Sequence, residues 1–203
     1  MKNLIKTSLL LLALLLPATA VAYDFEVGGI YYNINGNEVT VTQKGNGSWY
    51  DTSAYTGIIN IPETVTYDGV TYAVTAIDAS AFFGCSGLIS VTVPNSVTKI
   101  GSNAFNSCSG LKTVTIGNGV SSIGNDAFAY CSGLMDMIVD SHNPKYDSRD
   151  GCNAIIMTAR NSLLYGCQNT IIPNTVTKIE NYAFNGCSTL KSVIIPSSVT
   201  SIG

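Results

Sequence analysis

The chain has 203 residues, of which 46% are hydrophobic and only 11% are charged, and its formal net charge at pH 7 is −3. The charged share is about half that of an average soluble domain. This composition excludes a disordered charged tail, a polybasic nucleic-acid-binding protein and a long coiled coil held by ion pairs. We therefore expect neither nucleic acid nor an anionic membrane surface as a partner.

The N-terminus has the pattern of an export signal. Two lysines precede the apolar run Leu9–Leu16, and a small-residue cleavage site ends at Ala22. This pattern predicts a signal peptide over residues 1–22. The alternative is a membrane anchor, but the apolar run is shorter than a bilayer-spanning helix and is followed by Pro17. We expect a secreted or cell-surface protein with no membrane span after signal cleavage.

Residues 23–55 predict an N-terminal cap built on a β-hairpin. Residues 30–34 and 38–42 read as strands, and the Asn-Gly-Asn sequence at 35–37 between them is typical of a hairpin turn. A second turn signal at 67–69 predicts a smaller hairpin further along the chain. A hairpin before a set of stacked repeats would cover their exposed apolar end.

From residue 56 onward the sequence repeats with a period of 23 residues. Phe82, Phe105 and Phe128 are 23 residues apart, and each follows an alanine and precedes a cysteine by three positions. The pattern returns at Phe184, which is 56 residues after Phe128, so one repeat contains ten additional residues. Such a period is typical of a solenoid in which each repeat forms one coil. We place the solenoid over residues 56–203 and its insertion-bearing coil at about 140–166.

Each repeat combines a short strand with turns. The Leu-x-x-Val-x-Val pattern that begins at Leu88 alternates like a strand with inward apolar side chains. Pro94 and Asn95 turn the chain, Gly101 allows a tight corner, and the segment before Phe105 suits a single helical or 3₁₀ turn. Stacked coils would form a parallel ladder with strands about 4.8 Å apart. The predicted fold is a mainly β solenoid with an N-terminal β-hairpin cap.

The repeat unit A-F-x-x-C-x-x-L-x-x-V-x-I-P-x-x-V-x-x-I-G resembles the BspA-like leucine-rich repeats of bacterial surface antigens, over about residues 56–203. The resemblance implies a leucine-rich-repeat solenoid that is secreted or exposed at the cell surface. It also implies adhesion to host matrix proteins or to other cells, and it brings no catalytic residues. We expect a monomer without cofactors whose partner is a host extracellular-matrix or cell-surface protein. The sequence shows no nucleophile elbow or phosphate-binding loop, so we expect no enzymatic activity.

Four of the six cysteines occupy one repeat position: Cys85, Cys108, Cys131 and Cys187. Stacking would place them about 5 Å apart, which permits a disulfide, although parallel side chains do not favour its torsion. We expect buried thiols that act as small apolar residues, with bridges as the alternative. No CxxC pair or second histidine is present, and the oxygen-rich loop around His142 is explained by turn chemistry, so no metal site is predicted.

Cys152 and Cys167 lie outside that column, in the repeat that carries the insertion. A hairpin that turns at Ala159 and Arg160 would place them opposite each other, so they are candidates for a disulfide in an oxidising compartment. Two adjacent buried thiols are the alternative.

The outward strand positions predict the partner-binding surface. The first coils present serine and threonine there, whereas the later pairs are Asp136 and Ile138, Asn169 and Ile171, and Ser192 and Ile194. If the coils are consecutive, the three isoleucines form one exposed apolar stripe that a partner could contact. Strand propensity alone is the other explanation for these isoleucines.

A second candidate function is carbohydrate binding. Trp49 and the tyrosines of the cap could form a platform on which a sugar stacks. The same aromatic residues could instead form the small core of the cap itself.

Overall fold

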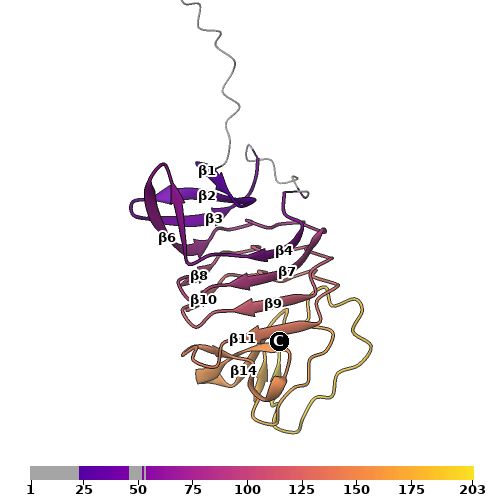
Figure 1. The fold of residues 1–203 in the computed structure, drawn as a ribbon. Helices are drawn as coiled ribbons and strands as arrows, with labels where there is room; N and C mark the ends of the chain where they lie inside the picture. Colours follow the sequence, from indigo (N-terminus) through magenta and orange to yellow (C-terminus); the bar gives the residue numbers. More distant parts are fainter. Residues whose placement is uncertain (1–22, 46–51, 53) are drawn as a thin grey trace, which may run out of the picture.

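The computed structural model describes residues 23–45, 52 and 54–203, which form an elongated stack of coils beneath an N-terminal hairpin (Figure 1). The predicted signal peptide and Trp49 lie outside the described residues. In the part that is described, no helix has the length and hydrophobicity to cross a membrane.

The cap is a small antiparallel sheet that continues into the solenoid. Strands β1 (Phe25–Val27), β2 (Ile30–Asn35) and β3 (Glu38–Thr42) pair in order, and β2 and β3 meet around the predicted Asn-Gly-Asn turn, so this hairpin is confirmed. Strand β3 then pairs in parallel with β6 (Val70–Ile77) of the solenoid. The free edge of the first coil is therefore covered by β3.

Two parallel ladders form the sides of the solenoid. One contains β6, β8 (Lys99–Ile100) and β10 (Ser122–Ile123), and β5 (Thr64–Tyr67) joins β6 through the hairpin predicted at 67–69. The other ladder has the order β4, β7, β9 and β11, with the bounds Gly57–Asn60, Leu88–Val93, Thr113–Ile116 and Asp136–Val139.

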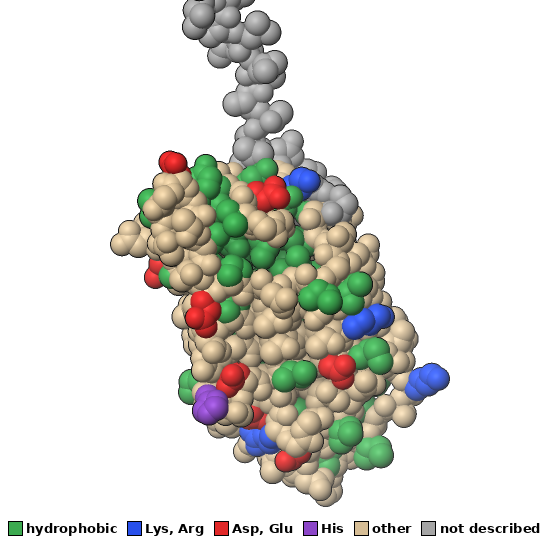
Figure 2. Space-filling view, in the orientation of Figure 1, with side chains coloured by type: hydrophobic (Ala, Val, Ile, Leu, Met, Phe, Trp, Pro, Cys, Tyr) green, Lys and Arg blue, Asp and Glu red, His purple; other side chains and the backbone are tan. Residues whose placement is uncertain are grey.

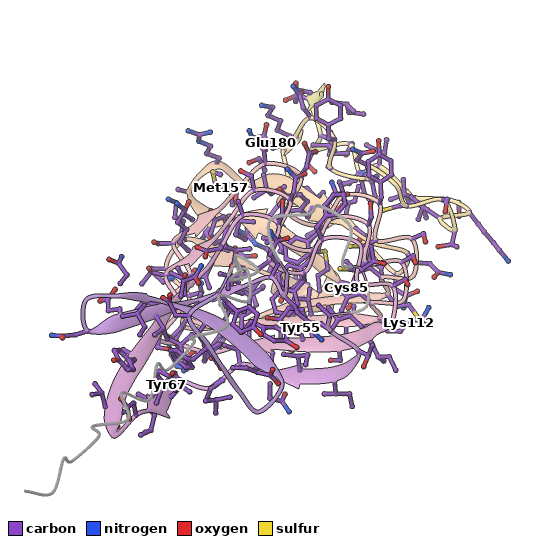
Figure 3. The ribbon with its side chains drawn as sticks, turned by 90° about the horizontal axis from the view of Figure 1, so that it is seen from above. Tyr55, Tyr67, Cys85, Lys112, Met157 and Glu180 are labelled. Atoms are coloured by element: carbon purple, nitrogen blue, oxygen red, sulfur yellow. The ribbon has the colours of Figure 1, made fainter. Side chains whose placement is uncertain are left out.

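The alternating pattern of the repeat explains the core. In β7 the side chains of Leu88, Val91 and Val93 are buried, and those between them face outward or are half-buried. The Ala-Phe segments form single turns in which Cys108 donates its backbone N–H to the Phe105 carbonyl three residues earlier, at 3.2 Å. Viewed along the stack in Figure 3, Tyr55 and Cys85 lie inside, whereas Lys112 and Glu180 lie at the periphery.

The repeat phenylalanines form an aromatic stack along the core. Ring centroids are 4.8 Å apart between Phe82 and Phe105 and 5.2 Å apart between Phe105 and Phe128. Tyr55 extends the stack at the cap end, and Tyr165 extends it into the inserted coil. The 23-residue period therefore places identical rings one above the other.

The regular stack ends after β11, where the inserted coil begins. This coil contains β12 (Tyr146–Asp147), η1 (Arg149–Gly151), β13 (Ala154–Met157), η2 (Thr158–Arg160) and β14 (Ser162–Gly166). The hairpin predicted to turn at 159–160 is confirmed by the pairing of β13 with β14. Strands β15 (Lys178–Ile179) and β16 (Ser201–Ile202) continue in parallel from β14.

The expected ladder strands around Ile171 and Ile194 are wrong, because these described segments contain no strand. The β13–β14 hairpin occupies the position next to β11. The Ile171 N–H consequently donates to the Cys152 carbonyl at 3.0 Å, rather than to β11. The last two coils therefore stack on the inserted coil, and a second, smaller core forms between them.

Candidate partner-binding surface

On the outward face of the β4-β7-β9-β11 sheet, the two central strands β7 and β9 have columns of hydroxyl side chains. The parallel register aligns Thr92 with Thr115 and Thr115 with Ile138, and it aligns Ser90 with Thr113 and Thr113 with Asp136. In Figure 2 this face is mostly polar, with hydrophobic side chains in separate patches. The hydroxyl array is therefore limited to β7 and β9: β11 brings Asp136 and Ile138 at one edge, and the exposed Ile58 of β4 aligns with Ser90 at the other.

A first groove follows the C-terminal ends of these strands. It has a volume of about 470 Å³ and is lined by Thr92, Thr115 and Ile138 on the strands and by turn residues such as Asn95 and Asp140. Ile138 is 45% exposed at the end of this groove. Asp136, its outward neighbour, is half-buried.

A second groove contains the other two predicted isoleucines. Ile171 is 70% exposed and Ile194 is 86% exposed, and both line a groove of about 370 Å³. No residue in the lining is charged: it consists of Thr170, Ile171, Ile172, Asn174, Ser192, Val193, Ile194 and Pro196. Asn169 is exposed beside this set.

The prediction that the three isoleucines form one continuous apolar stripe is therefore wrong. The structure brings Ile171 and Ile194 together but places Ile138 in a different groove. The cause is the β13–β14 hairpin, which separates β11 from the later coils. The prediction that these three side chains face outward is confirmed by their exposure.

Three of the four recurring cysteines, Cys108, Cys131 and Cys187, are thiols whose Sγ atoms lie against a carbonyl of the preceding coil. The Sγ atom of Cys108 lies 2.9 Å from the Phe82 carbonyl oxygen, and that of Cys131 lies 3.0 Å from the Phe105 carbonyl oxygen. Burial raises the pKa of Cys131 to about 12 and that of Cys187 to about 11. A thiol with a raised pKa is a poor nucleophile at neutral pH, so this column has a structural role.

The candidate disulfide pair Cys152 and Cys167 is not bridged in the structure, and both residues are buried thiols. A bulge between Ile155 and Ile156 shifts the hairpin register, and the Cys167 Sγ atom contacts the Asn153 carbonyl at 3.0 Å. The symmetric hairpin assumed from the sequence lacked this bulge. Cys152 and Cys167 consequently belong to different hydrophobic clusters.

Few titratable groups come together on the described surface. Among the described residues, no three His, Cys, Asp or Glu side chains are grouped closely enough to hold a metal ion. His142 is exposed, and its backbone N–H donates to Asp140 Oδ1 at 2.8 Å. This hydrogen bond, together with one from the His142 ring, lowers the pKa of Asp140. The contact is that of a polar turn.

The cap tyrosines within the described residues do not form a sugar platform. Tyr31, Tyr32 and Tyr55 are buried, and the Tyr55 hydroxyl donates to the Thr42 carbonyl at 2.5 Å. These rings form the core of the cap, which was the other explanation offered for them. Tyr23 is half-buried and packs on Tyr31, and the remaining members of the predicted platform, Trp49 and Tyr50, lie outside the described residues.

Sequence reasoning missed a cavity at the junction of β14 with the corner turns. It is lined by Asn125, Asp126, Leu164, Tyr165, Asn181 and Tyr182. The available signal was the tyrosine at position 182, because the equivalent positions of the other repeats carry the smaller residues Ser80, Asn103 and Asp126.

Comparison with known proteins agrees with this architecture. The sequence profile of the BspA type leucine rich repeat region matches residues 45–149 and 159–203, in six copies. Among curated proteins, none matches the sequence.

Solved structures of leucine-rich repeat proteins resemble the chain. One from Bacteroides capillosus has a TM-score of 0.50 and 24% identity, covering 86% of this chain and 96% of that one. A leucine rich cell surface protein from Faecalibacterium prausnitzii has a TM-score of 0.37 and 21% identity, covering 88% and 72%. A leucine-rich repeat protein from T. pallidum has a TM-score of 0.42 and 20% identity, covering 89% and 86%. The first of these shows the same fold.

Proposed function

The chain belongs to the BspA-type leucine-rich repeat family, and we propose that it is an exported surface or secreted protein that binds protein partners. Export rests on the pattern of residues 1–22, namely a basic start, an apolar run and a small-residue cleavage site. The partner is a host extracellular-matrix or cell-surface protein, and the protein acts in adhesion, as a monomer and without catalysis.

The observation that carries this proposal is the uncharged groove around Ile171 and Ile194. Large apolar side chains that are mostly exposed on a folded surface are candidates for contact with a partner. Ser192, Thr170 and Asn174 surround them, which matches an interface with an apolar centre and a polar rim. A solenoid offers such a surface with little ordering on association, which lowers the entropic cost of binding.

The test compares binding of matched variants to a panel of purified host extracellular-matrix proteins by surface plasmon resonance. The double variant Ile171→Ser and Ile194→Ser is expected to bind about tenfold more weakly or worse, as for central interface residues. Ser90→Asp with Thr113→Asp, on the hydroxyl array, is the control and is expected to bind like the parent. Ile138→Ser shows whether the first groove contributes.

The uncharged lining also predicts how binding responds to salt. Screening acts on charges, so affinity at the Ile171–Ile194 groove is expected to change little with ionic strength. Unchanged affinity of the double variant, or a steep loss of binding in salt, would show that the partner uses another surface.

A further inference from the structure

The corner turns of the repeat contain a position with left-handed backbone. Ser80, Asn103 and Asp126 have φ values of 59°, 56° and 55° at this position, two residues before the repeat phenylalanine. Asn and Asp adopt this conformation at lower energy than bulky residues. In the C-terminal coil the same position is Tyr182, with φ of 60°.

Burial of the Tyr182 side chain does not offset this backbone strain, because 73% of the residue is exposed. Backbone strain of this kind is retained at binding sites, where the side chain is needed for contact with a ligand. Tyr130 is also exposed with a left-handed backbone, but of the two tyrosines it is Tyr182 that lines a cavity between coils.

Tyr182 lines a cavity of about 280 Å³ together with Asn125, Asp126, Asn181 and β14. The cavity lies where the extended β14 strand replaces a corner turn in the stack. The Tyr165 hydroxyl donates to the Gly124 carbonyl at 2.8 Å on one side of the junction. On the other side the Gly166 N–H donates to the Ala183 carbonyl of the next coil at 2.8 Å. Asn125, Asn181 and Tyr182 are exposed, so the cavity is open to solvent.

The polar groups around this cavity are free to bind a ligand. The side chains of Asn125, Asp126, Asn181 and Tyr182 make no hydrogen bond to any described residue, whereas the Tyr165 hydroxyl is already used. The cavity therefore offers two amides that both donate and accept, one carboxylate that accepts, and an exposed phenol. It contains no Lys or Arg.

We propose that this cavity binds a single neutral sugar ring, such as a terminal hexose or N-acetylhexosamine of a glycan. Sugar hydroxyls both donate and accept, so they can satisfy the amides and the carboxylate together, while the C–H surface of the ring packs on an aromatic side chain. The Asp126 carboxylate and the absence of cationic side chains disfavour anionic ligands. A cationic ligand would pair with Asp126 but would use only the oxygen of each amide, whereas a sugar hydroxyl also accepts from the amide N–H groups. The site is separate from the Ile171–Ile194 groove and does not depend on it.

The first experiment is saturation-transfer NMR on the purified protein. The probes are glucose, galactose, mannose and N-acetylglucosamine, with glucuronic acid as the anionic comparison and N-acetylarginine amide as the cationic one. At least one neutral sugar is expected to receive saturation, and it should bind more tightly than either charged probe. Absence of transfer to all four neutral sugars, or tighter binding of the arginine probe, overturns the proposal.

Variants then locate the site. Tyr182→Asn removes the aromatic ring but keeps a residue that Asn103 shows to be compatible with this backbone, so it is expected to fold and to bind at least tenfold more weakly. Tyr130→Asn is the matched control, because Tyr130 is also exposed, has φ of 58° and lies outside the cavity lining. Its sugar affinity should equal that of the parent. Equal binding by parent and Tyr182→Asn would overturn the assignment of the site.

Discussion

At the residue scale, the recurring small residues are explained by contacts between neighbouring coils. A Cβ atom on Gly101 would lie 2.4 Å from the Ala79 backbone nitrogen, and one on Gly124 would lie 2.4 Å from that of Ser102. The sequence suggested that Gly101 allows a tight corner, but neither glycine has a positive φ. The close approach of the preceding coil therefore requires these glycines.

The Phe105→Ala substitution tests the aromatic stack. Phe105 is fully buried between the rings of Phe82 and Phe128. Its truncation removes contacts in both adjoining coils, and we expect a loss of about 3–5 kcal/mol in the free energy of unfolding. Denaturant titration followed by circular dichroism measures this loss. A variant as stable as the parent would show that the ring does not face the core.

The cysteine column predicts a pattern of chemical reactivity. Burial raises the pKa of Cys131 to about 12 and also raises that of Cys108, so both thiols should resist iodoacetamide in the native protein. Both should react fully after denaturation without a reducing agent. Mass spectrometry of the digested protein checks this result, and a peptide in which two of the column cysteines are joined would contradict it.

Much of the residue-level prediction followed from the repeat itself. Leu88, Val91 and Phe105 are buried as expected, because one stacked unit fixes which side chains point inward. The role of Cys108 as a donor to the Phe82 carbonyl was not predictable, since it depends on how far one coil is offset from the next. The left-handed backbone of Tyr182 was also not predictable, because aligned repeat positions do not reveal their φ angles.

At the scale of elements, the inserted coil is held by polar contacts as well as by its core. Arg149 and Asp147 form a bidentate pair, with Nε to Oδ1 at 2.7 Å and Nη2 to Oδ2 at 2.6 Å. Thr158 donates to the same carboxylate at 2.8 Å, and Arg149 also reaches Asn161 at 2.9 Å. These bonds connect η1, η2 and β12.

Acid should weaken this contact. Burial alone would raise the pKa of Asp147, but hydrogen bonds from Arg149 and Thr158 outweigh it, and the pKa is lowered in the folded protein. The resulting stabilisation is present above the ordinary carboxyl pKa and is lost as the pH falls through the lower folded value. Asp147→Asn should cost about 1 kcal/mol near neutral pH and should converge with the parent at low pH.

Thermal unfolding of parent and Asp147→Asn, from about pH 6 down to about pH 2, measures this difference. Two stability curves that remain parallel over the whole range would show that the carboxylate of Asp147 does not contribute.

The limits of sequence reasoning at this scale lie in the inserted coil. The β13–β14 hairpin was predicted from its symmetry about Ala159 and Arg160, but its bulge between Ile155 and Ile156 has no marker such as glycine. The bulge leaves Leu164 of β14 without a partner on β13, and this one extra residue shifts the register at the open end of the hairpin. It also means that the spacing of Cys152 and Cys167 could not decide their pairing.

At the scale of the whole molecule, the β13–β14 hairpin lies between two hydrophobic cores and contributes side chains to both. Ile155 and Cys167 pack into the large core of the cap and first coils, whereas Ile156 and Leu163 pack into the smaller C-terminal core. Adjacent strand residues point to opposite faces, so one hairpin serves both sides. Regular 23-residue coils would stack around one continuous core, and the inserted hairpin divides that core in two.

This division predicts that the C-terminal coils can unfold without the first coils. In a solenoid each coil is stabilised mainly by its neighbours, so a defect affects the nearest interfaces most. Ile156 is fully buried in the smaller core, and Ile156→Ala should cost about 2–5 kcal/mol there. Amide hydrogen exchange should then accelerate in β15 and β16, while β7 and β9 keep the protection of the parent. Phe105→Ala is the matched comparison, because it should accelerate exchange in β7 and β9. If Ile156→Ala accelerates exchange equally in β9 and β15, the two cores unfold as one unit, and the hairpin joins them rather than separating them.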